Sequence, residues 1–127
     1  MRVALDTNRW TDLFRGDAEL AELLSHCEEI YIPLIVMGEM QAGFLGGRHR
    51  KANEVLMRRF LDRPTVKLLL PSRQTAMEYA RIFVQLKNAG RPIPDNDLWI
   101  AAMVVENDLR LITRDKHFSY LPQLELA

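Results

Sequence analysis

The sequence contains a single cysteine, Cys27, in 127 residues. One thiol cannot form an internal disulfide, and the stretch around Cys27 offers no His or Asp partner at catalytic spacing, so we expect an unreactive thiol in a reducing compartment. Long apolar runs are also missing, since none approaches the roughly 20 residues that cross a bilayer, and Asp6 interrupts the first segment before a signal-peptide core could form. These absences predict a soluble cytoplasmic protein that does not associate with a membrane.

The chain also lacks a net charge, because its 17 Lys and Arg residues balance its 17 Asp and Glu residues. A neutral chain has no global field to attract a polyanion, which by itself argues against nucleic-acid binding. The charges are unevenly placed, however: basic residues gather between Arg48 and Arg63, whereas acids recur at isolated positions. Local fields therefore remain, although a solvated helix face is the favoured interpretation of the basic cluster over contact with RNA phosphates.

Tracts rich in Pro, Gly or Ser and internal repeats are absent too, so the chain is expected to form one domain, residues 1–127. Short apolar segments alternate with helical patterns. Strands are expected at residues 2–5, 30–32, 66–70 and 109–113, with a marginal fifth at 124–126. Helices are expected at residues 7–15, 17–27, 33–44, 48–61, 72–88 and 95–105. This alternation predicts right-handed crossovers, and therefore an α/β fold with a mostly parallel sheet of four or five strands and helices on both faces.

Four isolated acids stand where such a sheet places ligands. Asp6 and Asp115 directly follow predicted strands, Asp97 falls in the first turn of a helix, and Glu39 is the lone acid of an apolar helix. Each has a structural alternative: Asp6 as a helix cap, Glu39 in an ion pair, Asp97 as an acid favoured by the helix dipole, and Asp115 in a turn. Together they would repel one another, because two unit charges at 4 Å cost about 4 kcal/mol at an effective dielectric of 20. A shared cation would remove that cost.

Oxygen ligands alone suit Mg²⁺ or Mn²⁺, and no pair of the three histidines has zinc-site spacing. Such an ion activates a water and offsets charge on a phosphoryl oxygen, which favours phosphodiester hydrolysis. Asp97 is preferred to Asp95 as a ligand because small Ala101 lies one turn further along the face that must pack on the sheet. Asp95 is expected to cap the helix or to support a ligand, and Thr7 or Asn8 to cap the first helix.

These residues resemble a known family. Leu5-Asp6-Thr7-Asn8 after the first strand, Glu39, the segment Asp97-Leu98-Trp99-Ile100-Ala101-Ala102, and Thr113-Arg114-Asp115 look like the pattern of PIN-domain ribonucleases. Within that family the chain looks most like the VapC toxins of bacterial and archaeal type II toxin–antitoxin pairs, and the resemblance covers its whole length. Arg9 and Trp10 differ from the small or aliphatic residues that often follow the first motif.

The resemblance implies a three-layer α/β/α domain and a metal-dependent endoribonuclease. It implies that one or two Mg²⁺ or Mn²⁺ ions are held by Asp6, Glu39, Asp97 and Asp115. Thr7, Asn8 and Thr113 would orient the carboxylates or a water. It also implies a homodimer, a small antitoxin protein that covers the site, and a structured substrate such as transfer or ribosomal RNA.

Two other functions fit the same fold class. A metal-dependent phosphatase or phosphoacceptor also places an Asp after the first strand, but it usually has a second acid where this chain has Asn8, and no strand-end Lys is apparent. A non-catalytic binding module would use the acids only as caps and ion pairs. Arg114, Lys116 and His117 adjoin a ligand candidate, where phosphate contact and a plain surface role are both open. Trp10, Trp99 and Phe118 are expected to pack in the core rather than to stack on a base.

Overall fold

Five strands pair in parallel in the order β3-β2-β1-β4-β5, so β1 lies at the centre of the sheet. The structure is a computed structural model that describes all residues, 1–127. The strands are β1 (Arg2–Leu5), β2 (Glu29–Pro33), β3 (Val66–Leu69), β4 (Arg110–Ile112) and β5 (Glu125–Leu126). The helices are α1 (Thr7–Phe14), α2 (Ala18–Ser25), α3 (Leu34–Gly46), α4 (Arg50–Leu61), α5 (Arg73–Asn88) and α6 (Asp95–Glu106), followed by a short 3₁₀ turn, η1 (Lys116–Tyr120).

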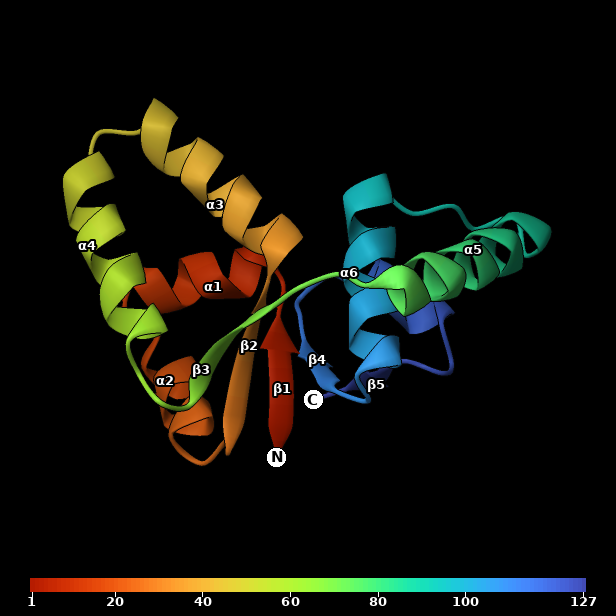
Figure 1. Cartoon of the computed structure of the whole chain (residues 1–127), viewed down its shortest axis with the longest axis horizontal. Coiled ribbons are helices and arrows are strands. Elements are labelled where there is room, and N and C mark those ends of the chain that lie inside the picture. Colours follow the sequence, from red (N-terminus) through yellow and green to blue (C-terminus); the bar gives the residue numbers. More distant parts are fainter.

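The helices form outer layers around this sheet. Figure 1 shows α1 to α4 on one side of the strands in that view and α5 and α6 on the other. The predicted α/β/α architecture with a parallel five-stranded sheet is therefore confirmed. The predicted strands and helices also begin and end within two residues of the observed ones. No helix combines the length and the apolar character that a membrane crossing requires.

The centre of the core is formed by β1 and α6. Val3, Ala4 and Leu5 are each 0% exposed, because neighbouring strands cover the edges of β1 and helices cover its faces. α6 is apolar around most of its circumference, as expected of a helix enclosed by protein. Its buried residues are Leu98, Ile100, Ala101, Ala102, Met103 and Val104. The helix that carries Asp97 is thus anchored along its length.

Only part of the apolar face predicted for α5 is buried. The helical pattern of residues 72–88 predicts one apolar face that includes Ala80 and Phe83, but both are exposed, Phe83 by 45%. Ile82 and Thr75 are buried in their place, each 0% exposed. The apolar residues of this helix lie on two sides, so periodicity alone could not choose between them. The structure selects the side on which the hydroxyl of Thr75 donates a hydrogen bond to Glu106 of α6.

Two smaller predictions also differ from the structure. The apolar pattern of α4 predicts a buried side that includes Val55, Met57 and Phe60, but Val55 is 44% exposed, whereas Met57 and Phe60 are buried. α4 packs against α3 and β3, and Phe60 also meets the rings of α1, so one side of the helix is covered. Pro33, expected in the first turn of a helix, ends β2 instead, and α3 begins at Leu34.

Candidate functional site

Asp6 lies at the carboxyl end of the central strand and is 3% exposed. One carboxylate oxygen accepts a hydrogen bond from the backbone N–H of Arg9 at 3.1 Å, and the other accepts one from the hydroxyl of Thr113. Asp6 is therefore the N-cap of α1, and the expectation that Thr7 or Asn8 would cap this helix was wrong. Each oxygen still has a lone pair for a further partner. Capping and ligand binding are compatible at this residue.

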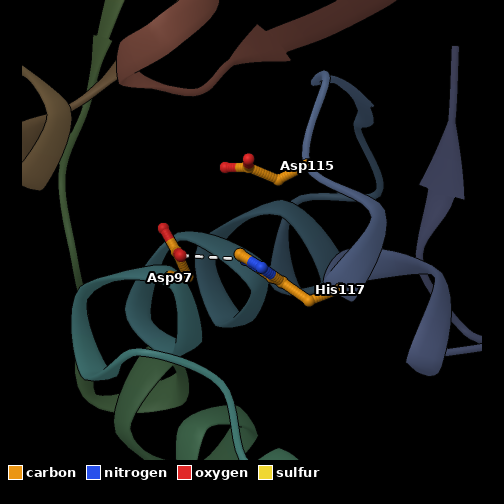
Figure 2. A group of neighbouring side chains, drawn as sticks. All are labelled: Asp97, Asp115 and His117. Carbon is orange, nitrogen blue, oxygen red and sulfur yellow. Dashed lines mark ion pairs between the residues drawn. The ribbon is translucent and has the colours of Figure 1, made fainter.

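Three more polar side chains meet near Asp6 at this edge of the sheet. They are Asp97, Asp115 and His117. One potential ligand atom from each lies within 4.8 Å of the other two. Asp97 is in the first turn of α6, Asp115 directly precedes η1, and His117 belongs to η1. Figure 2 shows the two carboxylates projecting into the same space, with the imidazole beside Asp97. The turn after β4 thus delivers two polar side chains to the start of α6.

The imidazole of His117 lies against one of these acids. Its Nε2 lies 2.9 Å from Oδ2 of Asp97. The ring nitrogen is buried without an aligned hydrogen bond, so the contact is a close ion pair when the imidazole is protonated. This contact was not predicted from the sequence. The available signal was the spacing Asp115-x-His117, which on a tight turn places both side chains near one point.

Glu39 reaches the site from α3. It is exposed, and its Oε1 accepts a hydrogen bond of 2.8 Å from the hydroxyl of Thr7. The anticipated ion pair between Glu39 and an Arg does not form. The four predicted acids and two of their predicted supporting residues enclose a hollow of about 200 Å³ with no hydrophobic residue in its lining. The lining consists of Asp6, Thr7, Asn8, Glu39, Asp97 and Asp115.

Thr113 connects two of the acids. Its hydroxyl donates to Asp6 and accepts the backbone N–H of Asp115 at 3.0 Å. Because a hydroxyl can donate and accept at once, this one side chain fixes the Asp6 carboxylate and the turn after β4 relative to each other. The role of Thr113 in orienting the metal-binding carboxylates stays a prediction.

Asp95 lies outside the hollow. α6 begins at Asp95, preceded by Pro94 without a side-chain cap, so the prediction that Asp95 caps this helix was wrong. Its carboxylate instead accepts a hydrogen bond from the hydroxyl of Tyr79, whose ring stacks on Trp99 with centroids 4.0 Å apart. Asp97, two residues on, is the acid that lines the hollow.

The electrostatics of the hollow favour a cation. Burial raises the pKa of Asp6, and the charges of Asp115 and Asp97 raise it further, against the lowering effect of its two hydrogen bonds. Burial also raises the pKa of Asp97; His117 opposes this, and the charges of Asp115 and Glu39 add to it. The nearby guanidinium of Arg114 is engaged by Asp12 at 2.8 Å. Negative charge in the hollow is therefore undercompensated, and its oxygen donors fit a hard divalent ion.

The aromatic residues behave largely as expected. Trp10 and Phe118 are 1% and 0% exposed and pack in the core, where Trp10 meets Phe60 edge to face. Trp99 is half-buried. Cys27 is 6% exposed, and burial raises the pKa of its thiol, which agrees with an unreactive side chain.

Known proteins are similar to this chain over most of its length. The family model described as "PIN domain" matches residues 3–124. "Ribonuclease VapC1" of Haemophilus influenzae (strain R2866) is 29% identical over 126 residues, covering 95% of this chain and 92% of the relative. "Ribonuclease VapC2" of Rickettsia felis is 29% identical over 106 residues, covering 83% and 78%.

Solved structures agree with these sequence matches. VapBC2 from Rickettsia felis, bound to a DNA fragment from its promoter, superposes with a TM-score of 0.89 at 26% identity, covering 100% of this chain and 98% of that one. VapBC-1 from nontypeable Haemophilus influenzae gives 0.89 at 27% identity, covering 100% and 97%. A DNA-bound VapBC from Salmonella typhimurium gives 0.90 at 19% identity, covering 100% and 97%, which shows the shared fold.

Proposed function

This chain belongs to the PIN domain family, and from that premise we propose that it is an endoribonuclease that uses Mg²⁺ or Mn²⁺ to hydrolyse RNA phosphodiester bonds. The observation that carries the proposal is the convergence of Asp6, Glu39, Asp97 and Asp115 on one polar hollow. Two of these acids have raised pKa values for which burial and neighbouring carboxylates are responsible. The relatives named as ribonucleases, which cover most of the chain, support the choice of RNA.

Asp6, Asp97 and Asp115 would hold the ion, with Glu39 completing the oxygen donors from the opposite wall. When bound, the ion supplies positive charge that offsets the charge developing on the phosphoryl oxygens and lowers the pKa of a coordinated water. Thr113 keeps Asp6 and the Asp115 turn in register through its two hydrogen bonds. Such supporting partners typically change metal affinity or activity 10- to 100-fold when removed, at order of magnitude.

Glu39 has one carboxylate oxygen free for the ion. Thr7 engages its Oε1, and its Oε2 accepts no hydrogen bond from the protein, so Oε2 remains available as a donor. Its exposure relative to Asp6 suits a group that meets solvent and substrate.

The same proposal includes a partner protein. In the VapBC structures from Rickettsia felis and Haemophilus influenzae, the matched chains are 26% and 27% identical to this chain, which covers 98% and 97% of their lengths. We therefore assign to this chain the role of the toxin of a toxin–antitoxin pair, inhibited by a small antitoxin and acting as a homodimer on structured cytoplasmic RNA such as transfer or ribosomal RNA.

The test is incubation of the purified protein with total RNA in Mg²⁺, in Mn²⁺ and in EDTA, beside Asp97→Asn and the neighbouring control Asp95→Asn. Cleavage by the wild type and by Asp95→Asn, and its loss with EDTA or Asp97→Asn, would support the proposal. Metal binding without RNA cleavage, together with hydrolysis of a phosphomonoester, would assign a phosphatase instead. A protein that neither binds metal nor cleaves RNA would be a binding module.

A further inference from the structure

A second and larger cleft opens from the acidic hollow. It has a volume of about 630 Å³ and lies among α1, α3 and α4, the three helices that enclose a triangle in Figure 1. Thr7 and Glu39 line both the hollow and this cleft, so the two spaces adjoin at these residues. A molecule that occupies the cleft therefore lies beside Glu39, one of the four acids.

The charges of the cleft are segregated. Glu39 is its only acid and stands at the end shared with the hollow, whereas Arg15, Arg48 and His49 line other parts of it. Arg15 follows the last residue of α1, about 12 Å along the helix from Thr7 at 1.5 Å per residue. Arg48 and His49 occupy the connection between α3 and α4. Basic side chains thus stand where the cleft is farthest from the acids.

These three basic side chains are not neutralised by the protein. None of them forms an ion pair, whereas Arg50, the next residue along, pairs with Glu54 at 2.9 Å, and Arg9 of α1 pairs with Asp12 at 2.9 Å. Between the basic side chains and the acids, the floor of the cleft is apolar and aromatic, and the rings of Phe14 and Phe44 stack with centroids 5.8 Å apart. Phosphates would meet the rim and bases the floor.

We propose that this cleft is the channel for one flank of the RNA strand, in which Arg15 and Arg48 bind phosphates about three nucleotides from the cleaved bond. The spacing follows from the rise of about 12 Å along α1 between Thr7 and Arg15 and from about 3.4 Å per stacked nucleotide. This inference rests on the proposed nuclease function, since it orients the substrate of that site. It would also allow a chain with zero net charge to bind RNA, because the cleft carries unpaired cations of its own.

The charge test compares two double variants of equal charge. Arg15→Gln with Arg48→Gln removes the cations of the cleft, and Arg58→Gln with Arg59→Gln removes two exposed, unpaired cations of α4 outside it. Binding of a fluorescent single-stranded RNA of about 12 nucleotides is titrated in EDTA at several salt concentrations. We expect only the cleft variant to lose affinity about tenfold, and its slope of log K against log salt to fall by about 1.4, at about 0.7 per phosphate contact.

A steric test keeps the charges unchanged. Gly43 lines the cleft from α3, and a Cβ added there meets no atom within 4 Å, so Gly43→Leu fills the cleft without a clash at its first atom. Gly38 of the same helix lies outside the cleft and is equally open, which makes Gly38→Leu the matched control. In Mn²⁺, we expect Gly43→Leu to raise KM for RNA cleavage at least fivefold with little change in kcat, and Gly38→Leu to leave both unchanged.

The outcomes separate the two proposals. Equal loss of RNA affinity in both charge variants would overturn the channel, because binding would then follow total charge alone. RNA binding and cleavage unaffected by the cleft variants would also overturn it and identify the cleft as a groove for a partner protein. Absence of wild-type cleavage in both metals would refute the nuclease function, whereas the binding comparison in EDTA would still report on the cleft.

Discussion

Substitution of Asp97 by Asn tests whether the acids of the hollow form a destabilised cluster that a cation relieves. Atoms of Asp97 and Asp115 lie within 4.8 Å, where two unit charges repel by about 0.9 kcal/mol in a water-like dielectric and by about 3.5 kcal/mol at an effective dielectric of 20. The neutral amide of the variant would lose about 0.5 kcal/mol of helix-dipole stabilisation, and it can still contact His117. We expect Asp97→Asn to raise the metal-free free energy of unfolding by about 1 kcal/mol.

Thermal unfolding in EDTA measures this gain, which corresponds to an increase in Tm of about 4 °C for a chain of this size. The pH dependence follows from the raised pKa of Asp97. A carboxyl whose folded pKa exceeds its unfolded value costs stability at neutral pH, and that cost disappears as the pH falls through the folded pKa. The advantage of Asp97→Asn should therefore shrink in acid.

When the same unfolding experiment is done with metal, we expect the wild type to become more stable than Asp97→Asn. Mn²⁺ at about 100 times its Kd would stabilise the wild type by about 2.7 kcal/mol and Asp97→Asn much less. Asp95→Asn, in the same helical turn but outside the hollow, should respond to metal as the wild type does. A large loss of metal-free stability in Asp97→Asn, or equal metal shifts in all three proteins, would show that Asp97 is a structural helix acid and refute the reasoning.

Three further predictions concern separate parts of the fold. Asp6→Asn and Asp6→Ala should both abolish RNA cleavage, but only the Ala variant should lose about 1 kcal/mol in urea unfolding, because Asn retains the cap of α1. Thr75→Val should lower the free energy of unfolding by about 1–3 kcal/mol by removing the hydrogen bonds of the Thr75 hydroxyl to Glu106 and to the backbone N–H of Ser72, and a Thr75→Ser variant that retains the hydroxyl should recover most of this loss. Ile82→Ala should cost about 2–5 kcal/mol, whereas Phe83→Ala should change stability by less than about 0.5 kcal/mol; the reverse order would contradict the observed face of α5.

The sequence predicts the sheet because parallel strands impose strong local patterns. The apolar segments around Val3, Ile30 and Leu111 are short, bounded by turns and separated by amphipathic helices, which leaves few topologies. The face of α5 was not predictable in this way, since Phe83 and Ile82 are both apolar and only packing against α6 distinguishes them. The exposure of Val55 could not be predicted for a similar reason: Val55 and the buried Met57 are both apolar residues of α4, and only the packing of that helix distinguishes them.

The candidate site was predictable to the extent that it follows from strand ends. Asp6 and Asp115 occupy the same edge by topology, and the first turn of α6 brings Asp97 to it. The contact of His117 with Asp97 depends on the 3₁₀ turn η1, whose conformation no periodicity indicates. Asp95 was assigned to a cap because acids favour that position, but the hydroxyl of Tyr79 from the neighbouring helix engages it instead.

The long-range pairing at the centre of the sheet bears on when the acids meet during synthesis. β1 pairs with β4, and Asp6 accepts a hydrogen bond from the hydroxyl of Thr113, which lies 107 residues further along the sequence. Pairing of this kind carries a large loop-closure entropy and is slow to form. A chain made from its amino terminus therefore keeps Asp6 apart from Asp97 and Asp115 until β4 and the turn after it have been translated and β4 has paired with β1. On the proposed function, the nascent chain is inactive before that pairing.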